Sequence, residues 1–357
     1  MARIPHPLVA RARRLATELL LPEAERVDQE GVPPGHVEAV KRSGLLGVAA
    51  PVDHGGWGAP PAVLRQITEI LAGACCSTWF VQTQHHTPVQ MLAASGLPVR
   101  ERLLGPLSRG ELLSGVAYAH LRSHGRCPVR VRRRGDGWRF DGTVPWYTGW
   151  GLNDVLLLAG ATDAGEVLFA FAEAREQPGL RASAPMRLAA LTAARTVSLE
   201  LDGLWLPAES VVLRTPYETW AAGDRARTRN TGPAVLGVAE AALSLLAEET
   251  AAPLRARLAG VRRRAYDLAD HPFPHERTGE RLAVRAEAYD VLRVATTAAV
   301  VAGGGRAMAL SSRAQRLARE GLFLLVQGQT AETREAHLRT LTASGGVTAA
   351  RDPGGAD

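Results

Sequence analysis

The sequence predicts an α+β protein built in three consecutive parts: an N-terminal helical domain, a central β barrel or sandwich, and a C-terminal helical bundle. Two observations support this fold class. Apolar residues recur at helical spacing in the first and last thirds of the chain, whereas short, alternating runs rich in Val and aromatic residues fill the middle. The chain has 357 residues, 46% of them apolar, which is enough for a large core.

The change in pattern sets the predicted domain boundaries. They are residues 1–111 for the helical domain, 112–214 for the β domain, 215–345 for the bundle and 346–357 for a flexible tail. Each part has its own signals. "VEAVKRSGLLGVAA" and "AVLRQITEILAGACCSTW" have helical spacing, "VRVRRR" and "WRFDGTVPWYT" flank a "GDG" turn, and long amphipathic segments such as "GERLAVRAEAYDVLRVATTAAVV" follow.

Composition excludes several classes of protein. The net charge of +6 comes from scattered Arg residues rather than from a basic patch with aromatics, so a nucleic-acid-binding scaffold is a poor alternative. The densest basic run, "RVRRRGDG", is interpreted as a solvated hairpin, with a binding patch for a phosphate or an anionic cofactor tail as the alternative. Cys75, Cys76 and Cys127 have no zinc-ligand spacing and indicate reduced thiols in a cytoplasmic protein without a metal site. Neither a signal peptide nor a membrane span is predicted.

Four segments, taken in order, resemble a known family. They are "GLLGVAAPVDHGGWG", "PLSRGELLSGVAYA", "GWRFDGTVPWYTGWGLNDVLLLAGAT" and "VSLELDGLWLPAESVV". Their order and spacing resemble the acyl-CoA dehydrogenase family of flavoproteins along nearly the whole chain. The resemblance implies a C-terminal four-helix bundle, bound FAD, and a dimer or tetramer in which neighbouring subunits share the cofactor sites.

The resemblance also implies which residues contact the cofactor. Trp146 would pack on the flavin ring and the Thr148 hydroxyl would reach its reactive nitrogen, since such a ring needs a flat apolar wall and a hydrogen-bond donor. The turn "VVAGGGRAM" would approach the adenine end across a subunit contact. The other residues that the resemblance assigns to the cofactor are Tyr118, Gly303, Gly304, Gly305, Gln329 and Thr330.

Several family motifs are altered. The loop "AYAHLRSHGRCP" lacks the expected acidic pairs, although Tyr118, His120 and Ser123 are candidates for substitute contacts. His120 and His124 are interpreted as solvated loop histidines rather than as a metal or acid–base pair. The family's Arg-x-x-Phe-Gly element is absent, and Arg255 and Arg257 are candidates to grip phosphates in its place.

The greatest departure lies in "LLVQGQT". In the family, a Glu in this motif removes the proton alpha to the thioester carbonyl while a hydride leaves the beta carbon; here Gln327 stands at that position, and an amide is not a useful base. Members that carry the base on an earlier helix align there with Arg225, Ala226 and Arg227, none of which is a base. Glu320 lies two turns before Gln327 and is expected to form a surface salt bridge.

These residues predict an acyl-CoA dehydrogenase-like, flavin-dependent oxidoreductase acting on an acyl thioester or a related small molecule. Its catalytic base is not identified. Two alternatives remain open: a flavin-dependent monooxygenase on the same fold, which needs no such Glu, and a non-catalytic subunit paired with an active homologue. The expected partners are the substrate and further copies of this chain or of a homologue, with neither nucleic acid nor membrane.

Overall fold

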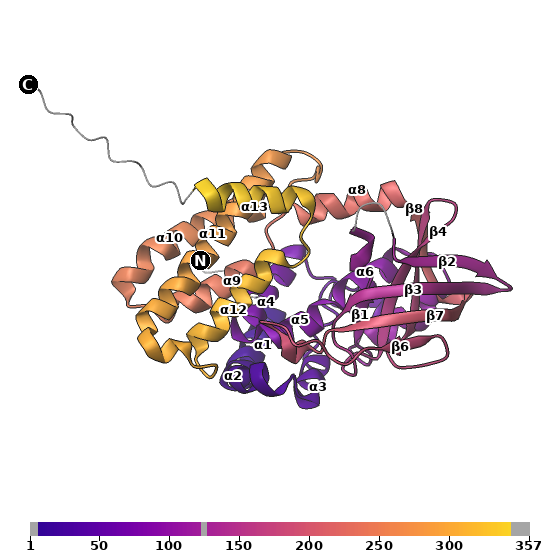
Figure 1. Cartoon of the computed structure of the whole chain (residues 1–357), viewed down its shortest axis with the longest axis horizontal. Helices are drawn as coiled ribbons and strands as arrows, with labels where there is room; N and C mark the ends of the chain where they lie inside the picture. Colours follow the sequence, from indigo (N-terminus) through magenta and orange to yellow (C-terminus); the bar gives the residue numbers. More distant parts are fainter. Residues whose placement is uncertain (1–5, 123–126, 344–357) are drawn as a thin grey trace, which may run out of the picture.

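The computed structural model describes residues 6–122 and 127–343. Helices gather on one side of the molecule and the β strands on the other, and α8 runs along one edge between them (Figure 1). The N-terminal helical elements are α1 (Pro7–Leu15), the π-helical turn η1 (Ala16–Leu20), α2 (Leu21–Glu30), α3 (Pro34–Arg42), η2 (Val52–His54), α4 (Pro61–Ala74), α5 (Cys76–Thr83), α6 (His86–Ala94) and α7 (Val99–Ser108).

Helix α4 shows why these segments are helical. Pro61 occupies its first turn, where the missing N–H costs nothing, and Val63, Ile67 and Leu71 repeat every four residues to form one buried stripe. Helix α4 also packs against α9 at very short range. A Cβ added to Gly237 of α9 would lie 2.1 Å from the carbonyl oxygen of Glu69, so this crossing requires glycine.

Within residues 6–122 and 127–343, eight strands form one hydrogen-bonded sheet. Their order is β6-β7-β3-β2-β4-β5-β8, and β1 pairs with β4 off this path. The elements are β1 (Ser114–Ala117), η3 (Ala119–Arg122), β2 (Val129–Arg134), β3 (Gly137–Tyr147), β4 (Val155–Thr162), β5 (Glu166–Glu173), β6 (Leu180–Ala182), η4 (Thr192–Ala194), β7 (Val197–Pro207), η5 (Ala208–Ser210) and β8 (Val211–Pro216).

Side chains along the strands alternate between the two faces of the sheet, and both faces are packed. On β5, Val167 and Phe169 pack with side chains of α6, α7 and α8, whereas Leu168 and Ala170 join a second core with β3 and β7. The hairpin predicted from "RVRRRGDG" is confirmed: β2 and β3 pair from Val129↔Gly142 to Arg134↔Gly137, with the Arg side chains of β2 exposed.

The C-terminal helices pack against the N-terminal ones. They are α8 (Tyr217–Thr228), α9 (Pro233–Leu243), α10 (Glu248–Ala269), α11 (Thr278–Gly303), η6 (Gly304–Met308), α12 (Arg313–Val326) and α13 (Ala331–Ala343). One apolar core contains residues from α1 to α5 and from α9 to α12, so the two helical segments that flank the sheet share their interior. The predicted tail, 346–357, lies outside the described residues. Within them, no helix is both long and apolar enough to cross a membrane.

His85 links α7 to β1 where the helices meet the sheet. Its Nδ1 accepts from the Ser114 backbone N–H at 3.1 Å, so Nε2 carries the proton and donates to the Leu107 carbonyl at 3.2 Å. The side chain is fully buried, and burial, with a smaller contribution from His86, lowers its pKa to about 3.

We expect this histidine to make stability depend on pH. In the unfolded chain the His85 imidazole takes up a proton near pH 6.5, whereas in the folded chain it does not. The contribution of His85 to the free energy of unfolding is therefore complete above pH 6.5 and is lost as the pH falls toward 3. Between pH 6.5 and 5, His85 alone should remove about 2 kcal/mol. Denaturant unfolding at several pH values would show a shallower decline in His85→Gln than in the wild type. Identical declines in the two proteins would contradict the expectation.

Candidate functional site

Trp146 is 52% exposed, whereas Val144 and Tyr147 on the same strand are fully buried. The register between β3 and β7 shifts between Val144 and Tyr147, so an irregularity in the pairing separates these two buried residues. Tyr147 and Val144 are fully buried, and Trp146 therefore presents a flat apolar surface outside the core. A ring system of similar size can stack on this surface.

The Thr148 hydroxyl lies two residues further on and is paired with a second hydroxyl. The Oγ1 atoms of Thr148 and Thr196 are 3.1 Å apart, and either can donate. Two hydroxyls sharing one hydrogen bond leave one proton to donate elsewhere. Asn153 fixes this segment: its Nδ2 donates to the Tyr147 hydroxyl and to the Thr148 carbonyl, both at 3.0 Å. Its Oδ1 is buried and has no partner among the described residues.

The turn around η4 holds this segment against the helices. Backbone N–H groups of Gly149 and Trp150 donate to the carbonyls of Ala194 and Arg195, at 2.9 and 3.2 Å. The Ala193 carbonyl accepts from Val32, which follows α2. Leu191 and Arg195, which flank η4, adopt the left-handed region with φ of 57° and 50°. This conformation is costly for non-glycine residues and persists only where the surroundings fix it.

Tyr118 and His120 are both buried beneath the surface of the β module. The Tyr118 ring packs edge-on against Phe169 at 5.5 Å, and burial raises its pKa against the opposing effects of Arg122 and a hydrogen bond with Thr87. The expectation that His120 is solvated is wrong: it is 2% exposed, and its Nε2 lies 3.0 Å from the Ala159 carbonyl on β4. Ser123 and His124 lie outside the described residues.

Gln327 directly follows α12, and the residues after it form the turn to α13. Its backbone N–H donates to the Phe323 carbonyl at 3.0 Å, and its side chain is half-buried. Gln329 donates from Nε2 to the Leu325 carbonyl at 3.3 Å, and Thr330 exchanges hydrogen bonds with Thr333 at the start of α13. These polar groups therefore cap the helix ends, and Gln327 alone has a side chain without a hydrogen bond among the described residues of this turn.

The turn lies beside η3 and α8. A Cβ added to Gly328 would lie 3.6 Å from Nη1 of Arg122, the last residue of η3. The Arg122 guanidinium is bound to Asp224 of α8, and η3 in turn contacts β3, the strand of Trp146. The structure therefore brings the α12–α13 turn, η3 and β3 into one neighbourhood. The sequence analysis considered residues 225 to 227 but not the neighbouring acid, Asp224. Nothing in the sequence pattern shows that this side of α8 is buried.

The surface salt bridge expected of Glu320 is wrong. Its side chain is 2% exposed, and both carboxylate oxygens accept from Arg316 Nη1, at 2.8 and 2.9 Å. Burial raises the pKa of Glu320, and the Arg316 charge opposes the change. The pair is surrounded by Glu25 of α2 and by Cys75 and Cys76, so it faces the helical core.

Gly303, Gly304 and Gly305 are exposed at the end of α11 and in η6. Thr278, the first residue of α11, accepts from Arg229 next to α8, and a helix of 26 residues rises about 39 Å. The glycines therefore lie far from α8 within one chain. Arg255 and Arg257 are engaged in ion pairs with Glu248 and Asp290, at 2.7 and 3.0 Å.

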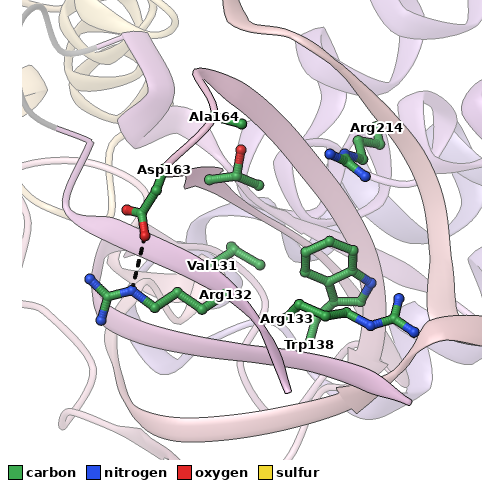
Figure 2. A pocket seen from close by; sticks show the side chains of 8 residues that line it. Val131, Arg132, Arg133, Trp138, Asp163, Ala164 and Arg214 are labelled. Carbon is green, nitrogen blue, oxygen red and sulfur yellow. Dashed lines mark hydrogen bonds and ion pairs between the residues drawn. The ribbon is translucent and has the colours of Figure 1, made fainter. Parts of the chain in front are cut away.

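A cavity of about 630 Å³ opens on the β sheet at a different place (Figure 2). It is lined by Val131, Arg132, Arg133, Trp138, Thr162, Asp163, Ala164 and Arg214. Trp138 precedes Trp146 by eight residues of β3, a separation of about 26 Å along a strand. Arg132 is paired with Asp163, and Arg214 with Glu166, so most of the positive charge is compensated and the cavity is separate from the Trp146 site.

No group of three His, Cys, Asp or Glu side chains within residues 6–122 and 127–343 is arranged to hold a metal ion.

The family model "Acyl-CoA dehydrogenase, N-terminal domain" matches residues 6–111. This match shows that residues 6–111 are similar to the N-terminal domain of acyl-CoA dehydrogenases.

Three known proteins resemble the chain over different lengths. It is 26% identical over 167 residues to 3-sulfinopropanoyl-CoA desulfinase of Paraburkholderia xenovorans, a match that covers 43% of the chain and 42% of the relative. The chain thus spans less than half of this relative's length. Butyryl-CoA dehydrogenase from Megasphaera elsdenii superposes with a TM-score of 0.80 at 17% identity, covering 96% of the chain and 100% of that structure.

A second similar structure is dibenzothiophene monooxygenase from Paenibacillus sp. A11-2. It superposes with a TM-score of 0.77 at 17% identity, covering 95% of the chain and 98% of that structure. Together these structures confirm the predicted order of N-terminal helices, central β sheet and C-terminal helices as the acyl-CoA dehydrogenase fold.

Proposed function

We propose that this chain is a flavin-dependent oxidoreductase of the acyl-CoA dehydrogenase type, acting on an acyl thioester or a related small molecule. The half-exposed indole of Trp146 beside the Thr148–Thr196 hydroxyl pair carries the proposal. These residues fit a bound FAD, because they offer a flat wall and a free hydroxyl proton at its edge. When bound, the flavin would accept a hydride or react with oxygen. The chain would hold the flavin in position and exclude water.

The first test is whether purified protein is yellow and releases flavin on denaturation. Colourless protein that does not bind added FAD or FMN would contradict the proposal. Trp146→Ala should weaken flavin binding by about 30-fold, the effect of losing a well-packed aromatic anchor. Trp205→Ala is the matched control, because Trp205 is also exposed (44%) on the same sheet but pairs across from Arg139, near the start of β3. Equal losses in both variants would contradict a specific role for Trp146.

One residue, Gln327, distinguishes the dehydrogenase hypothesis from the monooxygenase hypothesis. A proton alpha to a thioester is removed by a carboxylate, and Gln327 cannot do this. Gln327 therefore favours a second candidate function, oxygen chemistry on the same fold, which needs no base at this position. Oxygen uptake with a flavin reductase would separate a monooxygenase from a non-catalytic subunit, whereas rapid bleaching of the flavin by an acyl-CoA under anaerobic conditions would show dehydrogenation.

We infer that the chain acts as an oligomer of its own copies or with a homologue. Large apolar side chains are exposed around the end of α11 and η6: Val301, Met308 and Leu310. Patches of this kind are typical of protein interfaces. Gly304 and Gly305 leave open backbone next to this surface, where the cofactor of a second copy would approach. Light scattering of the purified protein would test the inference, which a monomer at micromolar concentration would contradict.

A further inference from the structure

Arg122 is held in one orientation by a buried carboxylate. Its Nε and Nη2 donate to the two oxygens of Asp224, at 2.7 and 2.8 Å. Two parallel hydrogen bonds fix the plane of a guanidinium. The Asp224 side chain is only 5% exposed, and the two residues join η3 to α8. Because both carboxylate oxygens accept from Arg122, Asp224 is poorly placed to act as a base.

The third guanidinium nitrogen, Nη1, remains available. It has no hydrogen-bond partner among the described residues, and the Arg122 side chain is 25% exposed. Nη1 faces Gly328, whose backbone is left-handed with φ of 62° and whose missing side chain leaves space. A cationic donor thus points at the turn in which the family resemblance places a catalytic acid.

The charges around this turn do not balance. Arg227 lies 3.6 Å from Asp224 and is largely exposed, and Arg225, two residues earlier on α8, forms no ion pair within the described part of the chain. Two arginines, Arg122 and Arg227, therefore share one buried carboxylate, and Arg225 interacts with Glu332. Arg229 is excluded from the count because Glu332 neutralises it at 2.8 Å. Excess positive charge beside a partly exposed guanidinium attracts an anion.

We propose that Arg122, oriented by Asp224, binds an acidic group, a carboxylate or sulfinate, on the acyl portion of the substrate. The proposal rests on the proposed function, since it requires the acyl chain to enter between the strand of Trp146 and the α12–α13 turn. A full negative charge is favoured over a neutral thioester carbonyl because the surroundings hold uncompensated positive charge. Gly328 provides the room that a side chain would fill.

The test compares thioesters of equal chain length. Calorimetry of the purified full chain would measure binding of succinyl-CoA against butyryl-CoA, of glutaryl-CoA against valeryl-CoA, and of CoA alone. In the wild type, at least one acidic thioester should bind about 10- to 100-fold more tightly than its neutral counterpart, the contribution of a hydrogen bond to a charged group. Arg122→Met should abolish this preference, so that acidic and neutral thioesters of equal chain length bind with equal affinity.

Two further variants sharpen the test. Arg132→Met removes a guanidinium that is paired with Asp163 on the other side of the module, and it should keep the preference. Asp224→Asn should reduce the preference without abolishing it, because Arg122 keeps its charge but loses its orientation. Circular dichroism would confirm that each variant is folded, and Arg122→Lys, which keeps the charge, should retain part of the preference if Arg122→Met does not fold.

The outcomes that would overturn the proposal are specific. Equal binding of acidic and neutral thioesters by the wild type would overturn it, and so would an equal loss of CoA itself in Arg122→Met, which would assign the arginine to the CoA phosphates. A loss of flavin bleaching in Asp224→Asn with the preference intact would make Asp224 a base instead. Failure of the proposed function is recognised separately, by the absence of bound flavin, because calorimetry needs no flavin signal.

Discussion

Glu320→Ala is expected to lower the free energy of unfolding by about 3–5 kcal/mol, the usual cost of leaving one partner of a buried ion pair uncompensated. Arg316 would lose both hydrogen bonds to the carboxylate and retain Glu25 at 3.2 Å, while its side chain stays 1% exposed. Denaturant unfolding at constant m-value would measure the change. The apolar double variant Arg316→Met/Glu320→Leu should recover most of the lost stability, because it removes both charges.

A matched control is available in the same bundle. Glu335 and Arg339 of α13 are also four residues apart, at 3.6 Å, but both side chains are largely exposed. Glu335→Ala should therefore change the free energy of unfolding by no more than about 0.5 kcal/mol. Similar losses in Glu335→Ala and Glu320→Ala would show that burial does not determine the strength of the α12 pair.

Gln327→Glu is expected to accelerate flavin bleaching by acyl-CoA by about 10²- to 10⁴-fold, the contribution of a positioned general base. The side chain at 327 is half-buried at the end of α12 and has no hydrogen bond to lose among the described residues, so the substitution should not disturb the fold. Anaerobic stopped-flow absorbance with a series of acyl-CoA thioesters would measure the rates of both proteins.

Two variants control for the position of the new acid. Gln329→Glu adds the same charge to the same turn, but at a side chain that bonds the Leu325 carbonyl, and it should not accelerate bleaching. Gly328→Glu tests the next residue along, at a backbone whose φ of 62° is unfavourable for glutamate and beside Arg122. If the wild type bleaches as fast as Gln327→Glu, a base exists elsewhere in the chain and Gln327 does not limit the reaction.

The order of helices and strands was predictable because each segment carries its own periodicity. The "GDG" hairpin and the amphipathic stripe of α4 follow from local residue types alone. The outward direction of Trp146 was not predictable from alternation, because the irregular register between Val144 and Tyr147 decides which side chains leave the core. The family resemblance suggested that residue, and the pairing of strands determined its exposure.

The errors concern residues whose environment comes from distant segments. An Arg and a Glu four residues apart, such as Arg316 and Glu320, are typical of an exposed helix face. Here Glu25, almost 300 residues earlier, and the helix that begins at Cys76 cover them. His120 is likewise buried by β4, and Asp224 is paired with an arginine about 100 residues away. No local pattern contains these contacts.

The strained turn around η4 also determines where this molecule can bend. Leu191 and Arg195 keep left-handed backbones because bonds to Val32, Gly149 and Trp150 leave no cheaper conformation. We expect a junction fixed in this way to be stiff, so that the sheet and α2 move together. Motion that admits or releases a reactant is then expected where α8 joins the sheet to the helices, and labels placed on α8 should report it.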